Sequence, residues 1–297
     1  MSDVETRLAE LEHKVGVLED IQAIRRLHWA YGYYIDFNRP DEVADLFAED
    51  GAVVFLSGEY VGKKGVKRLY GDWIAGRFTG GRPGPVNGLL LDHFQMQDII
   101  TVAPDRQTAK GRFHGILLGG WHDDFQETKE EMMPQQFMEA GIYENDYVRE
   151  GGVWKIKRLD YMMQWQANYE EGWAHTTAHL QPAEKTFPED PLGPDLLLPP
   201  EQHRKTWPYR QDVPMHFAHP KFGAMLAGEA KDCRAWPGSI RATPRAAKAG
   251  RRARWRSASS SCSTTRRTRA MRSCAGCIPT TSSTTRTRPP GAMRRWR

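Results

Sequence analysis

Residues 18–55, LEDIQAIRRLHWAYGYYIDFNRPDEVADLFAEDGAVVF, contain the pattern that decides the fold. Asn38-Arg39-Pro40 ends a long first helix, and Pro40-Asp41 begins a short second helix over residues 41–48. The Asp50-Gly51 turn then precedes a strand that starts at AVVFL. The first helix is predicted because apolar residues recur three or four positions apart and so form one buried stripe, namely Ile21, Ile24, Leu27, Tyr31, Tyr34 and Ile35.

The sequence after this stretch predicts a sheet with helices on one face. A short hairpin is followed by a helix over residues 63–78, and the long strands come last. We expect an α+β fold: a cone-shaped barrel of a curved antiparallel sheet with about three helices. Three helices do not fill such a sheet, so it should enclose a hydrophobic pocket. The strand-like runs cover residues 89–102, 108–121 and 137–165, the last folded back at Glu150-Gly151-Gly152.

Both ends of the chain differ from this middle part, which we place at residues 21–170. Residues 1–20 are predicted to form a helical, coiled-coil-like extension, which is either an oligomerisation arm or a helix packed on its own domain. Residues 171–228 are rich in proline and aromatic residues and are predicted to form an extended, irregular arm. The apolar residues of the extension follow a 4–3 spacing: Val4, Leu8, Leu11, Val15 and Leu18.

Residues 229–297 form a basic, low-complexity tail. From Arg241 onward the tail contains sixteen Lys or Arg residues and no Asp, Glu, Leu, Val, Phe or Tyr. Such a composition buries too little apolar surface to offset the entropy of ordering, so we expect disorder. A nucleic-acid-binding tail and a shifted reading frame are two explanations that stay open. The cysteines all lie here, and a single C-x-x-C is a weak metal or redox motif: Cys233, Cys262, Cys274 and Cys277.

The net charge of +5 comes from this tail. The part before residue 241 has 26 basic and 37 acidic residues, so its composition does not favour nucleic acid as a partner. The polar N-terminus is unlike a secretory signal, and no apolar run approaches the roughly 20 residues that span a membrane. We therefore expect a cytoplasmic protein, and a homo-oligomer if the N-terminal seam pairs.

Three side chains are candidates for chemistry: Asp36, His93 and His114. Asp36 ends the first helix where it should point into the pocket, or it is an exposed cap. Each histidine interrupts an apolar strand. If a hairpin centred on the Ala103-Pro104 turn joins these strands, positions 93 and 114 are predicted to pair. Two neighbouring histidines and a carboxylate form a proton-transfer site, whereas the alternative is a pair of buried, hydrogen-bonded histidines. The same three side chains are also the ligand set of a two-His, one-carboxylate metal site, although no metal is expected.

The same residues resemble a known superfamily. The helix text DIQAIRRLHWAYGYYIDFNRPDEVADLF, the two histidine strands and GGVWKI in the last hairpin are similar to the SnoaL-like, nuclear transport factor 2-like superfamily. Within it, residues 4–170 resemble the group of scytalone dehydratase, bile acid 7α-dehydratase and hexachlorocyclohexane dehydrochlorinase. The resemblance implies a fold without cofactor or metal, in which Asp36 and His93 form a catalytic Asp–His dyad.

The resemblance also assigns two further residues and shows where this chain departs from the group. His114 matches the second strand histidine of scytalone dehydratase, and Tyr31 matches the helix tyrosine of the bile acid dehydratase. Leu117 replaces an aspartate of the bile acid enzyme. The arginine that this enzyme carries on a late strand corresponds to a position near Met162-Met163 in this chain. Ile35 replaces a tyrosine of scytalone dehydratase. These departures argue against the substrates of both enzymes.

We therefore expect a cofactor-independent lyase (a dehydratase) or an isomerase that acts on a small hydrophobic cyclic substrate. His93 removes a proton, Asp36 orients the His93 ring, and His114 with Tyr31 or Tyr34 donates a proton or binds the enolate oxygen. The alternatives are a non-catalytic ligand-binding or assembly module and a polyketide-cyclase-like enzyme. The substrate-binding residues that we expect are Tyr34, Phe55, Trp73, Trp121 and Trp165.

Overall fold

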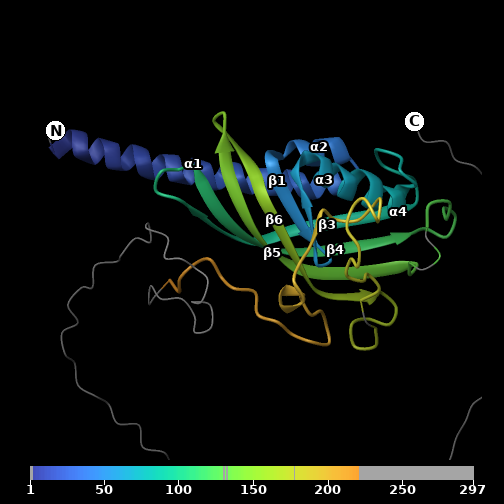
Figure 1. Ribbon diagram of the computed structural model, residues 1–297. Coiled ribbons are helices and arrows are strands. Elements are labelled where there is room, and N and C mark those ends of the chain that lie inside the picture. The colour runs from blue at the N-terminus through green and yellow to red at the C-terminus, as the bar shows by residue number, and fades with distance from the viewer. Residues whose placement is uncertain (1–2, 130, 132, 177, 221–297) are drawn as a thin grey trace, which may run out of the picture. The chain divides into compact units, whose positions relative to one another are not determined.

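The computed structural model describes residues 3–129, 131, 133–176 and 178–220 (Figure 1). The prediction of a disordered basic tail and the C-x-x-C motif lie outside these residues. Within the described part, no helix has the length and apolar character needed to cross a bilayer. The main elements in chain order are α1 (Asp3–Asp36), α2 (Pro40–Asp45), β1 (Phe47–Phe55), β2 (Gly58–Val61), α3 (Gly62–Lys67), a π-helical segment (Arg68–Ile74), α4 (Ala75–Thr79), β3 (Leu89–Val102), β4 (Thr108–Trp121), β5 (Gln136–Glu150), β6 (Val153–Asn168), β7 (Leu196–Leu197) and a 3₁₀ turn (Pro200–Gln202).

These strands form one curled sheet in the order β3-β4-β5-β6-β1-β2-β7. The predicted α+β fold, with few helices against a curved sheet, is confirmed (Figure 1). The sheet is mixed rather than wholly antiparallel, because β1 runs parallel to β6. Strand β1 also begins at Phe47, five residues before the predicted AVVFL start. The hairpin predicted at residues 150–152 is present, since β5 pairs with β6 up to Glu150 and Val153.

Helix α1 lies along strand β3 and covers the inner face of the sheet. Its buried residues recur at the spacing of one helical face, and Ile24, Tyr31 and Ile35 from the predicted stripe are among them. Two polar residues in the same stripe, Asp20 and His28, are also buried. The helix approaches β3 closely at Gly32, where an added Cβ would lie 3.1 Å from the carbonyl oxygen of His93.

A β-bulge in β3 changes which residues of β3 and β4 face each other. Before the bulge His93 pairs with Leu117 and Met96 with His114, and after it Ile99 pairs with Arg112. Gln97 has a φ of +53°, which marks the position of the extra residue. The predicted pairing of positions 93 and 114 is therefore wrong by three residues. Because the shift is odd, it moves His114 to the opposite face of the sheet.

The segment after β6 runs back along the sheet as an extended arm. The backbone N–H groups of Ala183 and Leu198 donate to the carbonyl oxygens of Leu56 and Ser57, and β7 pairs with β2. Further on, the Arg112 guanidinium donates to the carbonyl oxygen of Val213 at 2.7 Å. These contacts hold the arm against its own domain over its described length.

Candidate functional site

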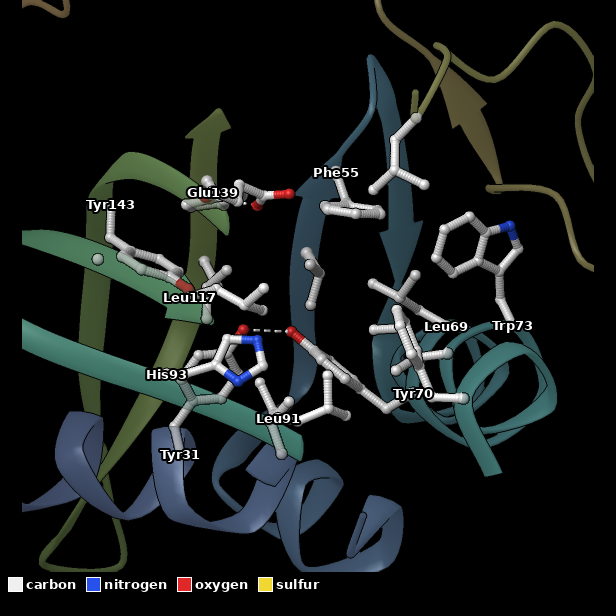
Figure 2. A pocket seen from close by; sticks show the side chains of 18 of the residues that line it. Tyr31, Phe55, Leu69, Tyr70, Trp73, Leu91, His93, Leu117, Glu139 and Tyr143 are labelled. Atoms are coloured by element: carbon white, nitrogen blue, oxygen red, sulfur yellow. Dashed lines mark hydrogen bonds between the residues drawn. The ribbon is translucent and has the colours of Figure 1, made fainter. Parts of the chain in front are cut away.

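A mainly apolar cavity of about 80 Å³ lies between the curled sheet and its helices (Figure 2). We call it the inner cavity. Two of the predicted substrate-binding residues, Phe55 and Trp73, line it and meet edge to face with ring centroids 5.6 Å apart. Tyr31 lines it as well. The polar groups that reach this apolar space are few, and they come from α1, the π-helical segment, β3, β5 and β6.

Asp36 and His93 meet at the edge of the inner cavity. The Asp36 Oδ1 atom lies 2.7 Å from the His93 Nδ1 atom and also accepts the backbone N–H of His93 at 2.8 Å. The backbone bond places the carboxylate, and the carboxylate then sets the imidazole ring by accepting the Nδ1 proton. Both side chains are largely buried, and His93 lines the cavity. This arrangement leaves the Nε2 atom as the ring nitrogen with a lone pair.

Glu139 reaches the same cavity from β5 and is a site residue that the sequence analysis missed. The strand register places His93, Leu117, Glu139 and Gln166 in one row across β3, β4, β5 and β6. Figure 2 shows Leu117 between His93 and Glu139 on one side of the cavity. Tyr161 and Gln166 donate hydrogen bonds to the two oxygens of Glu139, at 2.7 and 2.8 Å.

The surroundings of Glu139 favour its protonated form. Burial raises the pKa of the Glu139 carboxyl, and the hydrogen bond from Tyr161, the charge of His93 and the Gln166 hydrogen bond offset that rise only in part. A carboxylic acid that holds its proton nearer to neutrality is suited to donate it to a departing group. The site thus contains a candidate base on β3 and a candidate acid on β5, with β4 between them.

Three tyrosine hydroxyl groups lie deeper in the cavity. The hydroxyl oxygens of Tyr31 and Tyr70 are 2.8 Å apart, the contact that is dashed in Figure 2. Burial raises the pKa of Tyr31 and of Tyr70. Burial also raises the pKa of Tyr143, and the adjacent Gln95 amide opposes that rise only in part. All three hydroxyl groups therefore stay protonated and act as hydrogen-bond donors.

A buried histidine determines how Gln95 faces the cavity. Burial lowers the pKa of His28 to about 3, although the hydrogen bond with Gln95 opposes that shift, so the ring is neutral. Its Nε2 atom lies 2.9 Å from the Gln95 Oε1 atom. Gln95 lines the cavity, and its Nε2 group is buried and makes no hydrogen bond of normal geometry with the described residues.

Asn145 fixes the tautomer of His28. Its Oδ1 atom accepts the backbone N–H of Asp160 at 3.0 Å, so its amide nitrogen must point the other way. That nitrogen lies 3.3 Å from the His28 Nδ1 atom, which therefore accepts, and the Nε2–H group donates to Gln95. The chain of hydrogen bonds ends with the Gln95 amide N–H groups as donors on the side away from His28.

The remaining predicted site residues lie elsewhere. His114 is on the outer face, where its Nδ1 atom is 2.9 Å from the Gln97 Oε1 atom. Trp121 packs in a second core cluster against Phe78, with ring centroids 5.7 Å apart. Trp165 meets Trp173, and Tyr34 is a half-buried residue packed against the main core.

A larger cavity of about 590 Å³ adjoins the inner one, and we call it the outer cavity. The two share Phe55, Tyr161 and Leu180 in their linings. Leu180 belongs to the C-terminal arm, and its backbone N–H donates to the Gln166 Oε1 atom at 3.1 Å. Since the Gln166 amide also donates to Glu139, the side chain of Gln166 connects the arm to the acid of the site.

The site has no obvious place for a metal ion. Among the residues that the structure describes, no three His, Cys, Asp or Glu side chains are grouped as metal ligands. The Asp36–His93 pair lacks a third such ligand because His114 is on the other face. The chemistry available to the described side chains is the removal and donation of protons in an apolar space.

Residues 16–160 match the family model described as a SnoaL-like domain, and this part of the chain is a SnoaL-like domain. One solved structure with this fold is a scytalone dehydratase-like protein from Novosphingobium aromaticivorans, 24% identical, covering 57% of this chain and 96% of its own, with a TM-score of 0.42. Another is the type 3 hexachlorocyclohexane dehydrochlorinase from Novosphingobium barchaimii, 18% identical, covering 52% and 93%, with a TM-score of 0.42. No curated protein sequence matches the chain.

Proposed function

We propose that this protein is a cofactor-independent lyase that eliminates water from a small, hydrophobic, cyclic hydroxy-carbonyl compound. The observation that carries the proposal is the pairing of Asp36 with His93 at 2.7 Å beside the buried acid Glu139 in one apolar cavity. A base and an acid with different environments are what an elimination across two adjacent carbon atoms requires.

The reaction begins with proton removal by the His93 Nε2 atom from the carbon next to the carbonyl group. Asp36 stabilises the imidazolium that forms. The Gln95 amide, with the hydroxyl of Tyr143, binds the enolate oxygen. The carbon–oxygen bond of the hydroxyl group then breaks as Glu139 protonates the leaving oxygen, giving an unsaturated carbonyl compound and water. Transfer of the proton from His93 back to the Glu139 carboxylate, through water, restores the site.

The dimensions of the two cavities favour a ring that extends past the inner cavity. A cavity of about 150 Å³ holds benzene, whereas the inner cavity has about 80 Å³. A ring substrate must therefore displace part of the wall. Phe55 and Leu180 stand between the two cavities, so their movement joins the inner space to the 590 Å³ outside it.

Hydrogen–deuterium exchange tests the base separately from the acid. The protein is incubated in D₂O with a panel of cyclic β-hydroxy ketones, and mass spectrometry follows deuterium uptake at the α-carbon and loss of water. We expect both in the wild type. His93→Gln should lose both by about 10²- to 10⁴-fold, while the matched variant His114→Gln, on the outer face, should keep both.

Glu139→Gln should separate the two steps. Deuterium uptake should continue because His93 is intact, and loss of water should fall by at least about 100-fold because the proton donor is absent. If His93→Gln keeps more than a tenth of the wild-type exchange, or if its effect equals that of His114→Gln, the proposed base is wrong. Binding of the ketones without exchange in the wild type would favour the ligand-binding module instead.

A further inference from the structure

The first half of α1 presents an apolar stripe to solvent. Every residue from Asp3 to Val15 is exposed, and Val4 and Leu18 are 71% and 63% exposed. A helix of this length is marginal by itself in water, because its packed face supplies most of its stability. The stripe consists of five residues at alternating spacings of four and three, Val4, Leu8, Leu11, Val15 and Leu18.

The stripe points away from the rest of the domain. At the point where α1 reaches the sheet, Gly16 and Asp20 are buried while Val15 and Leu18 are exposed. The Arg106 guanidinium lies against Gly16 and donates from Nε to the Asp20 carboxylate at 2.5 Å. Because a helix turns by about 100° per residue, these buried positions are nearly opposite the stripe. A second helix can therefore lie along the stripe without meeting its own domain.

The 4–3 spacing assigns Leu8 and Val15 to heptad position a, and Val4, Leu11 and Leu18 to position d. Position g is then Arg7 and Lys14, and position e is Glu12 and Glu19. In a parallel pair of helices, a g residue faces the e residue five positions later in the partner. Arg7 thus faces Glu12 and Lys14 faces Glu19, all with opposite charges.

An antiparallel pair would bring like charges together. In that orientation g faces g and e faces e, which places basic residues against basic ones and acidic residues against acidic ones. The same charges that favour the parallel arrangement therefore oppose the other. One of the two a positions, Val15, is β-branched, and two of the three d positions, Leu11 and Leu18, are leucine, which favours two strands over more.

We propose that residues 4–18 of α1 form a parallel, in-register, two-stranded coiled coil with a second copy of this chain. The two domains then lie on the outer sides of the paired helices. The pairing covers the apolar stripe and stabilises the exposed half of α1. The seam ends after Leu18, because the next a and d positions are Gln22 and Arg25 and because Arg25 pairs with Asp98 at 2.6 Å.

Sedimentation of the full chain at low ionic strength tests the pairing. The wild type should have twice the 33.9-kDa chain mass. Arg7→Glu with Lys14→Glu, the acidic variant, should raise the dimer dissociation constant at least ten-fold, because every g–e contact becomes repulsive. Glu12→Lys with Glu19→Lys, the basic variant, should do the same. An equimolar mixture of the two variants should form dimers again.

The parallel orientation of the two helices is tested separately in the full chain. A disulfide should join the two introduced thiols of Leu11→Cys, a d position, because parallel, in-register helices bring the same residue of each copy together. Peptide mapping distinguishes this bond from any made by the native cysteines. The matched variant His13→Cys, on the opposite side of the helix, should not form the corresponding bond.

Four results would overturn the proposal. A monomeric wild type excludes the coiled coil. A dimer whose dissociation constant is unchanged in the acidic variant has another interface. Circular dichroism and the unfolding temperature of the acidic variant show whether a weakened dimer results from misfolding. A Leu11→Cys bond to a different position excludes the parallel register, and a trimeric mass excludes two strands. None of these results depends on the proposed lyase activity.

Discussion

The His28 Nε2 atom lies 2.9 Å from the Gln95 Oε1 atom, and this contact turns the amide nitrogen of Gln95, a residue of the cavity wall, away from His28. A neutral histidine whose other nitrogen accepts from Asn145 can only donate to Gln95. The glutamine therefore cannot flip without leaving a buried donor against a donor. His28 does not line the cavity, but it positions a residue that does.

Replacing Gln95 should weaken the binding of a developing enolate. We expect Gln95→Leu to lower kcat by about 10²- to 10³-fold with little effect on KM, because an oxyanion donor acts mainly in the transition state. Steady-state kinetics of water loss measures this effect. Gln97→Leu, two residues along β3 but on the outer face, is the matched control and should retain activity. Equal losses in the two variants would contradict the role of Gln95.

The neutral His28 should make the protein less stable in acid. In the unfolded chain it binds a proton below about pH 6.5, whereas burial lowers its pKa to about 3 in the folded protein. Its contribution to stability is therefore complete above pH 6.5 and falls by roughly 1 kcal/mol per pH unit as the pH decreases toward 3. Urea unfolding of the wild type and His28→Gln between pH 7 and 4 measures the difference in slope. NMR of the folded wild type should show a neutral His28 ring at pH 4.5. A protonated ring at that pH would contradict the lowered pKa of His28.

Asp36→Asn should inactivate the enzyme without unfolding it. A neutral asparagine amide does not stabilise the imidazolium that forms when His93 takes up a proton. The asparagine oxygen can still accept the backbone N–H of His93, so the local structure is retained. We expect α-carbon exchange in D₂O to fall by about 10²- to 10⁴-fold. Asp92→Asn, on the other face of β3, should exchange at the wild-type rate, and a comparable loss there would point to a change in the strand rather than in the dyad.

The contribution of Glu139 to stability should have the opposite pH dependence to that of Glu144, which lies on the same strand. Burial raises the pKa of Glu139, so its contribution to stability is present at low pH and is lost as the pH rises through that raised pKa. Glu139→Gln should therefore gain stability relative to the wild type between pH 4 and 8. Thermal unfolding at several pH values measures this trend.

Glu144→Gln is the matched control on the same strand. Burial raises the pKa of Glu144, but the contacts of His216 and Arg112 outweigh it and the net shift is downward. Its contribution is present above the ordinary carboxyl pKa of 4.5 and is lost as the pH falls below it, so Glu144→Gln should lose stability relative to the wild type as the pH rises through about 4.5 and show no further change up to pH 8. The same trend in both variants would contradict the assignment of Glu139 as the protonated acid.

Much of the fold was predictable because it depends on periodicity. The 3–4 spacing of apolar residues predicts the buried face of α1, and alternation with Gly151-Gly152 predicts the β5–β6 hairpin. The position of Asp36 after Ile35 and of His93 in an apolar strand made both candidates. Their contact required the approach of α1 to β3 at Gly32, which no local pattern reveals.

The errors in the site come from register. The pairing of 93 with 114 assumed a regular hairpin, and the bulge at Gln97 together with a longer turn broke that assumption. Glu139 left a readable signal, since it alternates with Phe137 and Tyr143 on the apolar face of its strand. His28 left another, because it continues the helical stripe between Ile24 and Tyr31. A polar residue at an apolar position was the clue in both cases.

Leu180 lies beyond the part of the chain that matches the SnoaL-like family model, yet it forms part of the cavity wall next to the acid. Gln166 holds it there through backbone N–H groups, so the attachment does not depend on which side chain position 180 carries. Evolution can therefore exchange this wall residue, and with it the shape of the accepted molecule, without disturbing the strands that hold the base and the acid. If the proposed activity holds, the residues that carry the reaction and a residue that shapes the accepted molecule lie in separable stretches of the chain.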